Sequence, residues 1–254
     1  MLRIEDHGAV RLLTLSRPDV LNAFNRELYR AGADALEAAA GDDGVAVVVI
    51  TGEGRAFSAG QDLGEMLSLA NDRERGDESD GSAFNPFVDA LIDFPKPLLA
   101  AVNGVGVGLG LTLLGHCDVV LIADTARLRA PFTSLGVVPE AGGSFTLPEL
   151  MGRQAAAHAV YTSAWIDADE AVAHGLAWRA VPAARLLDEA MAVAAEIAAM
   201  PMASLVESKR LLDAGRADLI RAARAREEAV FADLMGSPAN RAALESFVER
   251  RPPG

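Results

Sequence analysis

The sequence contains almost no cysteine and very little lysine. With one cysteine in 254 residues, Cys117, no internal disulfide can form, and this usage is typical of a reducing compartment. Cys117 lies in an apolar segment, so we interpret it as a small core residue and not as a nucleophile. Residues 1–5 do not resemble a secretory leader, and we therefore expect a cytoplasmic protein.

An excess of positive charge and long apolar runs are also missing. The formal net charge is −13 at pH 7, which argues against a surface for nucleic acid or for an anionic membrane. No apolar run reaches the roughly 20 residues that span a bilayer, so no membrane association is predicted. The four histidines are scattered without the spacing of metal ligands, and no redox cofactor motif is present. We therefore predict neither a metal nor a cofactor.

Apolar residues are abundant and follow two different periods. They make up 51% of the chain, which is enough for a sizeable core. Strands are expected at residues 10–15, 45–50, 97–102, 118–123 and 127–130. Helices are expected from Asn22 or Asn25 to about residue 40, and at 63–69, 87–93, 108–115, 142–151, 154–162, 167–174, 183–200, 202–214 and 217–235. The order predicts an α/β core with helices added at the end, and the polar segment 71–82 is predicted to be a mobile loop.

Two glycine-rich turns stand out because each follows an expected strand. One spans residues 52–63 and the other 103–110. Small residues at Ser58, Ala59 and Gly60 leave the main chain uncovered, so a ligand can approach backbone N–H groups there. Two such donors on separate turns can converge on one oxygen, as in an oxyanion hole. Neither turn matches the dinucleotide-binding pattern, and tight strand-to-helix turns alone would also explain the glycines.

Five motifs in this order and spacing resemble the crotonase (enoyl-CoA hydratase/isomerase) superfamily along almost the whole chain. They lie at residues 17–25, 56–63, 95–104, 108–118 and 135–143. The resemblance implies a spiral of β-β-α units, with an acyl-CoA-binding core at residues 1–198 and a C-terminal helical region at 199–254. It further implies a coenzyme A thioester as substrate, an enolate intermediate, and assembly of the C-terminal helices into homotrimers or hexamers built from two trimers.

The resemblance also assigns roles to individual residues. The backbone N–H groups of Ala59 and Leu109 would be the oxyanion donors. The family usually has glycine at the position of Leu109, so this side chain must point away from the oxygen. Contacts to the pantetheine and adenine would come from Ala23, Ala56, Ser58, Gly60, Gln61, Asp62 and Leu63. Arg26, Arg55 and Lys209 are candidates for the phosphates, although each is also readily explained as a solvated surface cation.

The carboxylates decide which chemistry the resemblance implies. In the hydratase branch two glutamates handle a water molecule, and they would fall here at Thr112 and Phe132, neither of which is acidic. Glu140 instead resembles the acid of Δ3,Δ2-enoyl-CoA isomerases, which removes a proton from C2 and returns one to C4. The apolar residues around it are expected to raise its pKa toward neutrality.

Three alternatives stay open at this point. Glu140 could simply be an acid placed at a helix start by the dipole of the helix that follows. The protein could be a hydratase or another thioester enzyme of this fold. It could also bind acyl-CoA without catalysis, since the positions of both hydratase glutamates have lost their acid.

Overall fold

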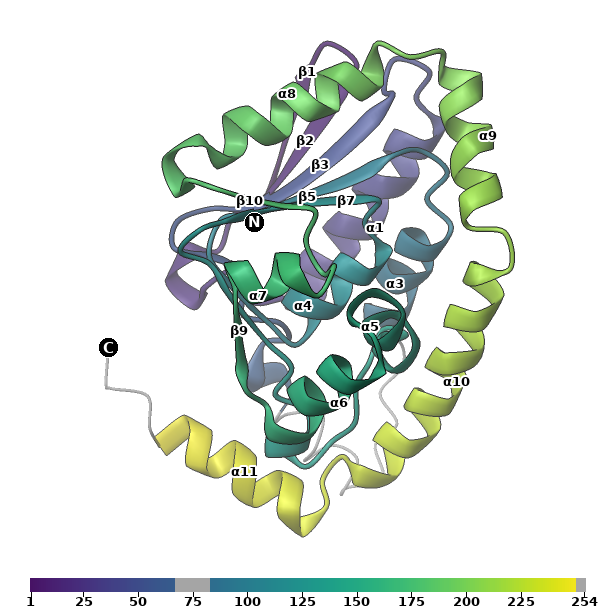
Figure 1. Ribbon diagram of the computed structural model, residues 1–254. Helices are drawn as coiled ribbons and strands as arrows, with labels where there is room; N and C mark the ends of the chain where they lie inside the picture. The colour runs from purple at the N-terminus through teal and green to yellow at the C-terminus, as the bar shows by residue number, and fades with distance from the viewer. Residues whose placement is uncertain (67–82, 250–254) are drawn as a thin grey trace.

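Two β-sheets form the frame of the molecule in a computed structural model that describes residues 1–66 and 83–249 (Figure 1). The larger sheet has the order β1 (Leu2–His7), β2 (Val10–Leu15), β3 (Val47–Gly52), β5 (Leu98–Val102), β7 (Val119–Ala123) and β10 (Arg179–Val181). The smaller has the order β4 (Ala56–Ser58), β6 (Val105–Val107), β8 (Arg127–Arg129) and β9 (Trp165–Asp167). The α/β class is confirmed, whereas the loop predicted at 71–82 lies outside the described residues.

The chain alternates between the two sheets as it advances. β3, β5 and β7 are parallel neighbours in the larger sheet, and the strand after each of them, β4, β6 and β8, joins the smaller sheet. Each circuit therefore stacks beside the previous one, and the result is the spiral that the resemblance implies. The consequence for function is that the two glycine-rich turns, fifty residues apart in sequence, become neighbours.

Helices cover both faces of the larger sheet (Figure 1). α8 (Leu186–Ala198) packs on β2, β3, β5 and β7, while α1 (Arg26–Gly41) packs on β1, β2 and α3 (Phe84–Ile92). The interior strands β3 and β5 are almost wholly buried apolar residues, as expected for parallel strands covered on both faces. α1 begins at the cap provided by Asn25, whose side chain accepts a hydrogen bond from the Leu28 N–H at 3.0 Å.

The other α-helices with described bounds follow β6 in the chain. They are α4 (Leu109–Thr112), α5 (Gly143–Met151), α6 (Arg153–Thr162), α7 (Ala168–Ala173), α9 (Met202–Leu212), α10 (Arg216–Leu234) and α11 (Pro238–Glu249). α10 descends along one side of the molecule and packs against α5 (Figure 1). The division of the chain at residue 198 stays a prediction.

Across the described ranges, no single helix is long and apolar enough to cross a membrane. The pair at Ala183–Ala198 and Met202–Leu212, which is bent by 104°, meets the length and composition criteria only when the two helices are joined.

The expected strands were found close to their predicted positions, but β1, four three-residue strands and α11 were not predicted. β1 is largely exposed, so it lacks the apolar pattern that marks the other long strands. β4, β6, β9 and β10 each have three residues, too few to display an alternating pattern. They form because their backbones pair with neighbours that are distant in sequence. The helix expected at 63–69 is helical over 63–66, and its remainder lies outside the described residues.

Candidate active site

Asn22 holds the first glycine-rich turn in place through hydrogen bonds to its backbone. This residue is fully buried, and its side chain accepts a hydrogen bond from the Arg17 N–H at 2.9 Å. Its amide nitrogen donates to the carbonyls of Glu53 and Ala56, at 2.9 and 2.8 Å. Asn22 thus satisfies three backbone groups at once, which fixes the segment that holds the turn.

The amide of Ala59 is not available as an oxyanion donor, contrary to the prediction. Its N–H donates to the Leu21 carbonyl at 2.8 Å. The exposed donor is displaced by two residues to Gln61. Phe24 pairs with Gln61 through the bonds Phe24 N–H to Gly60 O and Asp62 N–H to Phe24 O, at 2.7 and 2.8 Å. Because those bonds engage the groups on either side of Gln61, the N–H of Gln61 itself points away from Phe24.

The second turn presents the amide of Leu109 to the first turn. Leu109 is the first residue of α4, so its N–H has no partner within the helix. A Cβ on Gly60 would lie 3.3 Å from the Leu109 nitrogen and 2.5 Å from the Val107 carbonyl oxygen, which shows how closely the two turns approach. The Leu109 side chain is buried in the core, so it points away from the turn as the resemblance requires. The amides of Gln61 and Leu109 are therefore two donors at this junction that have no backbone acceptor among the described residues.

The acidic side chain of Glu140 lies beside the helix that follows the second turn. Its carboxylate oxygen Oε1 lies 3.4 Å from the Thr112 hydroxyl, on the helix that begins at Leu109. Removal of the carboxylate from water raises its pKa to about 8; the negative charge of Glu227 adds to this, and the hydrogen bond from Thr112 opposes it. A carboxylate with this pKa can both take and release a proton near neutral pH.

Glu140 does not cap the helix that follows it. The first amides of α5 are capped by a different acid, Glu227 of α10, which accepts the N–H groups of Gly142 and Ser144 at 2.8 and 2.6 Å. Glu227 is therefore the acid that caps α5, and the carboxylate of Glu140 does not bind the amides at the start of this helix. Sequence reasoning missed Glu227, although an acid on the same helical stripe as the apolar Ile220 and Ala223 was a usable signal.

Tyr29 is a second residue that the sequence analysis did not single out. It extends from α1, where Phe24, Phe84 and Phe87 pack against its ring. Its buried hydroxyl has no hydrogen-bond partner among the described residues. Burial raises the pKa of Tyr29 well above its usual value, and the charges of Glu140 and Glu65 raise it further. The hydroxyl therefore stays protonated near neutral pH. It lies close enough to Glu140 for the charge of that carboxylate to act on it.

The residues predicted to contact coenzyme A fall into two groups. Ala23, Ala56, Ser58 and Gly60 are buried, whereas Gln61, Asp62 and Leu63 are partly exposed. Arg17 ties the two segments together, because its guanidinium donates to the Ala23 carbonyl and pairs with Asp62 at 3.2 Å. The partly exposed group is thus the accessible part of the predicted binding segment, and its contact with coenzyme A stays a prediction.

Lys209 is not the surface cation that the sequence analysis considered. It is buried, and its ammonium donates to Asp118 at 2.8 Å and to the Lys96 carbonyl at 3.0 Å. These bonds make it a structural residue that joins α9 to the start of β7. Arg26 and Arg55 are exposed and remain the accessible candidates for the phosphates.

His116 is buried, and Cys117 is partly buried and packs against the core, which agrees with the interpretation of Cys117 as a small packing residue. Burial raises the pKa of the Cys117 thiol, so the reactive thiolate is disfavoured. Burial lowers the pKa of His116 to about 4. In the part of the chain that the structure covers, no three His, Cys, Asp or Glu side chains gather as a metal site would require.

Known proteins similar to this chain belong to one family. A family model described as enoyl-CoA hydratase/isomerase matches residues 5–254. "Probable enoyl-CoA hydratase" of Rhodobacter capsulatus is 34% identical over 99% of this chain and 96% of the relative. "Enoyl-CoA delta isomerase 2" of Rattus norvegicus is 33% identical over 98% of this chain and 63% of the relative. The crystal structure of an enoyl-CoA hydratase/isomerase from Pseudoalteromonas atlantica superimposes with a TM-score of 0.91 at 35% identity, covering 100% of this chain and 98% of that one.

Proposed function

The chain belongs to the enoyl-CoA hydratase/isomerase family, and from that premise we propose that it is a Δ3,Δ2-enoyl-CoA isomerase in which Glu140 moves a proton from C2 to C4. Membership of this family supports an enzymatic activity on acyl-CoA thioesters, without specifying the reaction. The relatives carry hydratase and isomerase names alike, so the choice between the two reactions depends on the site of this chain.

The observation that carries the proposal is that one carboxylate stands where hydration would need two. Thr112 places a hydroxyl 3.4 Å from Glu140, and Phe132 is a buried apolar side chain. Addition of water needs one group to accept a proton from the water and a donor for the carbon that receives it. Migration of a double bond adds nothing to the substrate, so a single acid that is first a base and then an acid is sufficient.

The proposed reaction balances without a further reactant. Glu140 in its ionised form takes a proton from C2 of a 3-enoyl thioester. The electron pair of the C–H bond then forms the C2=C1 bond of a dienolate, and the negative charge moves to the thioester oxygen. When the carbonyl re-forms, the C3=C4 electrons take back the proton from Glu140 at C4, which leaves the double bond between C2 and C3.

The amides of Gln61 and Leu109 are proposed to hold the thioester oxygen during this step. Backbone N–H groups suit the purpose because they are fixed before the charge develops and are too weakly acidic to give up their protons. Loss of one such donor typically costs about 3 kcal/mol of transition-state stabilisation. The buried side chain of Leu109 keeps the space in front of its amide free for the oxygen.

The test is to incubate the protein separately with a 3-enoyl-CoA and with a 2-enoyl-CoA. We expect conversion of the first to a 2-enoyl-CoA, followed by the absorbance of the conjugated thioester, and no 3-hydroxy product from the second. Glu140→Gln should lower kcat by at least a thousandfold, because the amide cannot take the proton. Asp233→Asn, which removes an exposed charge on α10, should leave kcat unchanged.

Each other outcome favours a different function. A 3-hydroxyacyl product as the main product would favour hydration. Tight binding of acyl-CoA without exchange of the C2 proton in heavy water would favour an inert binder. Full turnover by Glu140→Gln would remove Glu140 from the mechanism. Assembly into trimers or hexamers stays a prediction, which sedimentation of the purified protein would check.

A further inference from the structure

The turn that carries Glu140 has a backbone conformation that needs support. Ala141 has φ of 56° and Gly142 has φ of 76°, so two consecutive residues are left-handed. This conformation costs energy for alanine, whose Cβ approaches the following carbonyl. One bond within the turn, from the Gly143 N–H to the Glu140 carbonyl at 2.8 Å, closes it. The direction in which the Glu140 side chain points is set by what else holds these residues.

Glu227 holds the turn from the side of α10. Its two carboxylate oxygens accept the N–H groups of Gly142 and Ser144, at 2.8 and 2.6 Å. Glu227 is only 5% exposed, so these bonds are shielded from water. A Cβ on Gly142 would lie 2.6 Å from Cγ2 of Ile220, which is two helical turns before Glu227 on the same face of α10. α10 and the turn are therefore in direct contact.

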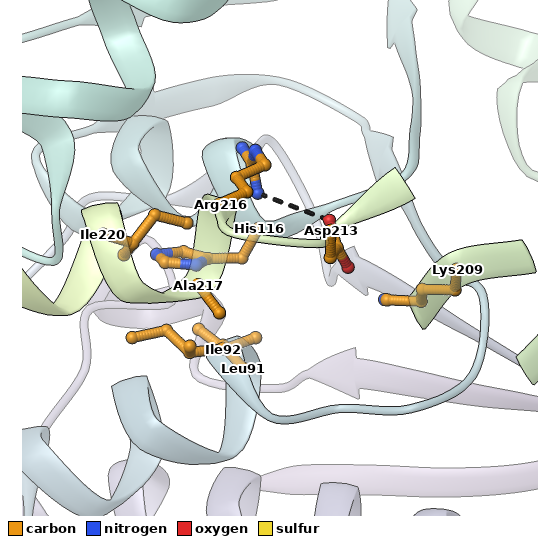
Figure 2. Close-up of a pocket in the computed structure, with 8 residues that line it drawn as sticks. All are labelled: Leu91, Ile92, His116, Lys209, Asp213, Arg216, Ala217 and Ile220. Atoms are coloured by element: carbon orange, nitrogen blue, oxygen red, sulfur yellow. Dashed lines mark ion pairs between the residues drawn. The ribbon is translucent and has the colours of Figure 1, made fainter. Parts of the chain in front are cut away.

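His116 also holds this turn, through its imidazole. Its Nε2 lies 2.8 Å from the Ala141 carbonyl oxygen, and because a carbonyl only accepts, Nε2 must carry the proton. Figure 2 shows the imidazole among Ala217 and Ile220 of α10 and Leu91 and Ile92 of α3. The low pKa of His116, about 4, keeps the ring neutral near pH 7, so it adds no charge beside Glu140.

We propose that Glu227 is a positioning residue for Glu140: its two hydrogen bonds fix the turn, and its charge acts on the carboxylate that the turn carries. This inference rests on the proposed function of Glu140. No part of it requires Glu227 to touch the substrate. In this proposal α10 supports the active site, although the five family motifs all lie before residue 144.

The charges around both carboxylates are consistent with this role. Glu227 is the ionisable group whose charge raises the pKa of Glu140. On α1, the Tyr29 hydroxyl stays protonated and contributes no charge. The pKa of Glu227 is itself raised by burial, against the effect of the bonds from Ser144 and Gly142 and of the positive charge of Arg226. His116 is neutral, so Glu227 is the group through which a single substitution can change the charge felt by Glu140.

The experiment compares Glu227→Gln and Glu227→Ala with wild type, with Asp233→Asn as the matched control on the same helix. The first readout is the NMR titration of Glu140, with glutamate labelled with ¹³C at its side-chain carboxyl carbon. The Glu140 signal is assigned by its loss in Glu140→Gln. The second readout is kcat for a 3-enoyl-CoA as a function of pH. The first readout needs no turnover, so it tests the inference even if the proposed reaction is wrong.

For Glu227→Gln we expect the Glu140 midpoint, and the acid limb of kcat, to move to lower pH by about one pH unit, because a like charge has been removed. Glu227→Ala should also lower kcat about tenfold or more, since both amides of the turn lose their acceptor. Asp233→Asn should change neither readout. An unmoved Glu140 midpoint in Glu227→Gln would overturn the proposal, and so would kcat within twofold of wild type in both Glu227 variants. If Glu227→Ala fails to fold, Glu227→Gln alone decides.

Discussion

The main-chain nitrogen of Leu109 lies 3.3 Å from the point that a Cβ on Gly60 would occupy. The same point is 2.5 Å from the Val107 carbonyl oxygen, a distance that a real Cβ does not tolerate. Gly60 also has φ of 82°, which only glycine adopts at little cost. The junction of the two glycine-rich turns therefore depends on the absence of one methyl group.

Gly60→Ala is expected to separate the two turns. The added methyl group must push the Val107 backbone away, so we expect a loss of about 2 kcal/mol in the free energy of unfolding. The misplaced donors should also lower kcat/KM at least a hundredfold. Gly8→Ala is the control, because Gly8 has φ of 63° and nothing within 4 Å of its Cβ position. It should lose about 1 kcal/mol with unchanged kcat/KM, and a Gly60→Ala enzyme of normal activity would contradict the proposed donors.

Glu140→Gln is expected to make the protein more stable at alkaline pH. The pKa of Glu140 is about 8 in the folded protein, above its value of about 4.3 in the unfolded chain. Between these values the folded state binds more protons than the unfolded state, so this group's contribution to stability falls as pH rises. His116, with its pKa lowered to about 4, has the opposite effect below about pH 6.5.

The measurement is urea denaturation of wild type and Glu140→Gln from pH 6.5 to pH 9. The variant should gain stability relative to wild type as the pH increases, because glutamine has no proton to lose. A stability difference between the two proteins that is constant from pH 6.5 to pH 9 would contradict a raised pKa of Glu140 in the folded protein.

Lys209→Met tests whether Lys209 is structural or binds coenzyme A. The substitution removes the cation that Asp118 contacts at 2.8 Å, so we expect a loss of about 3 kcal/mol in the free energy of unfolding. KM for the acyl-CoA should stay unchanged in the fraction that folds. Arg55→Ala, at an exposed cation of the predicted phosphate set, should do the reverse: a higher KM with normal stability. A higher KM for Lys209→Met would support the prediction that Lys209 contacts the phosphates of coenzyme A.

Tyr29→Phe is expected to stabilise the protein. The hydroxyl of Tyr29 is buried with no partner in the residues that the structure covers, and an unsatisfied buried polar group costs about 1–3 kcal/mol. The phenylalanine ring would keep the contacts with its aromatic neighbours. Thermal and urea denaturation should show a gain of about 1 kcal/mol, against almost none for Tyr161→Phe, whose residue is 72% exposed. A loss of stability in Tyr29→Phe would reveal an acceptor for the hydroxyl.

Long apolar segments were predicted well because one chain segment contains the whole pattern. β3 and β5 are strands of five or six consecutive residues that are almost entirely buried, and α1 shows its cap and its apolar stripe within 17 residues. β4 and β6 have three residues each and no local signature. They exist because the two backbones pair with each other, Ala56 opposite Val105.

The glycine-rich turns and Glu140 were identified from sequence, but Ala59 was the wrong residue for the first amide, and the role of Leu109 stays a prediction. The sequence shows where a backbone is uncovered by side chains, not which N–H group already has an acceptor. Leu21 provides that acceptor for Ala59, and pairing with Phe24 turns Gln61 outward. Both partners lie almost forty residues earlier in the chain.

The sequence by itself determined the family motifs, the α/β order, the two uncovered turns and the presence of one acid where hydration would need two. Each of these is a property of residue identity within a short segment. Only the tertiary structure decided that Gln61 offers the first amide, that Lys209 is buried on Asp118, and that Glu227 supports the turn of Glu140. Those assignments depend on which hydrogen-bond partners meet across 37 to 91 residues of chain, and long-range pairing of this kind leaves no local pattern.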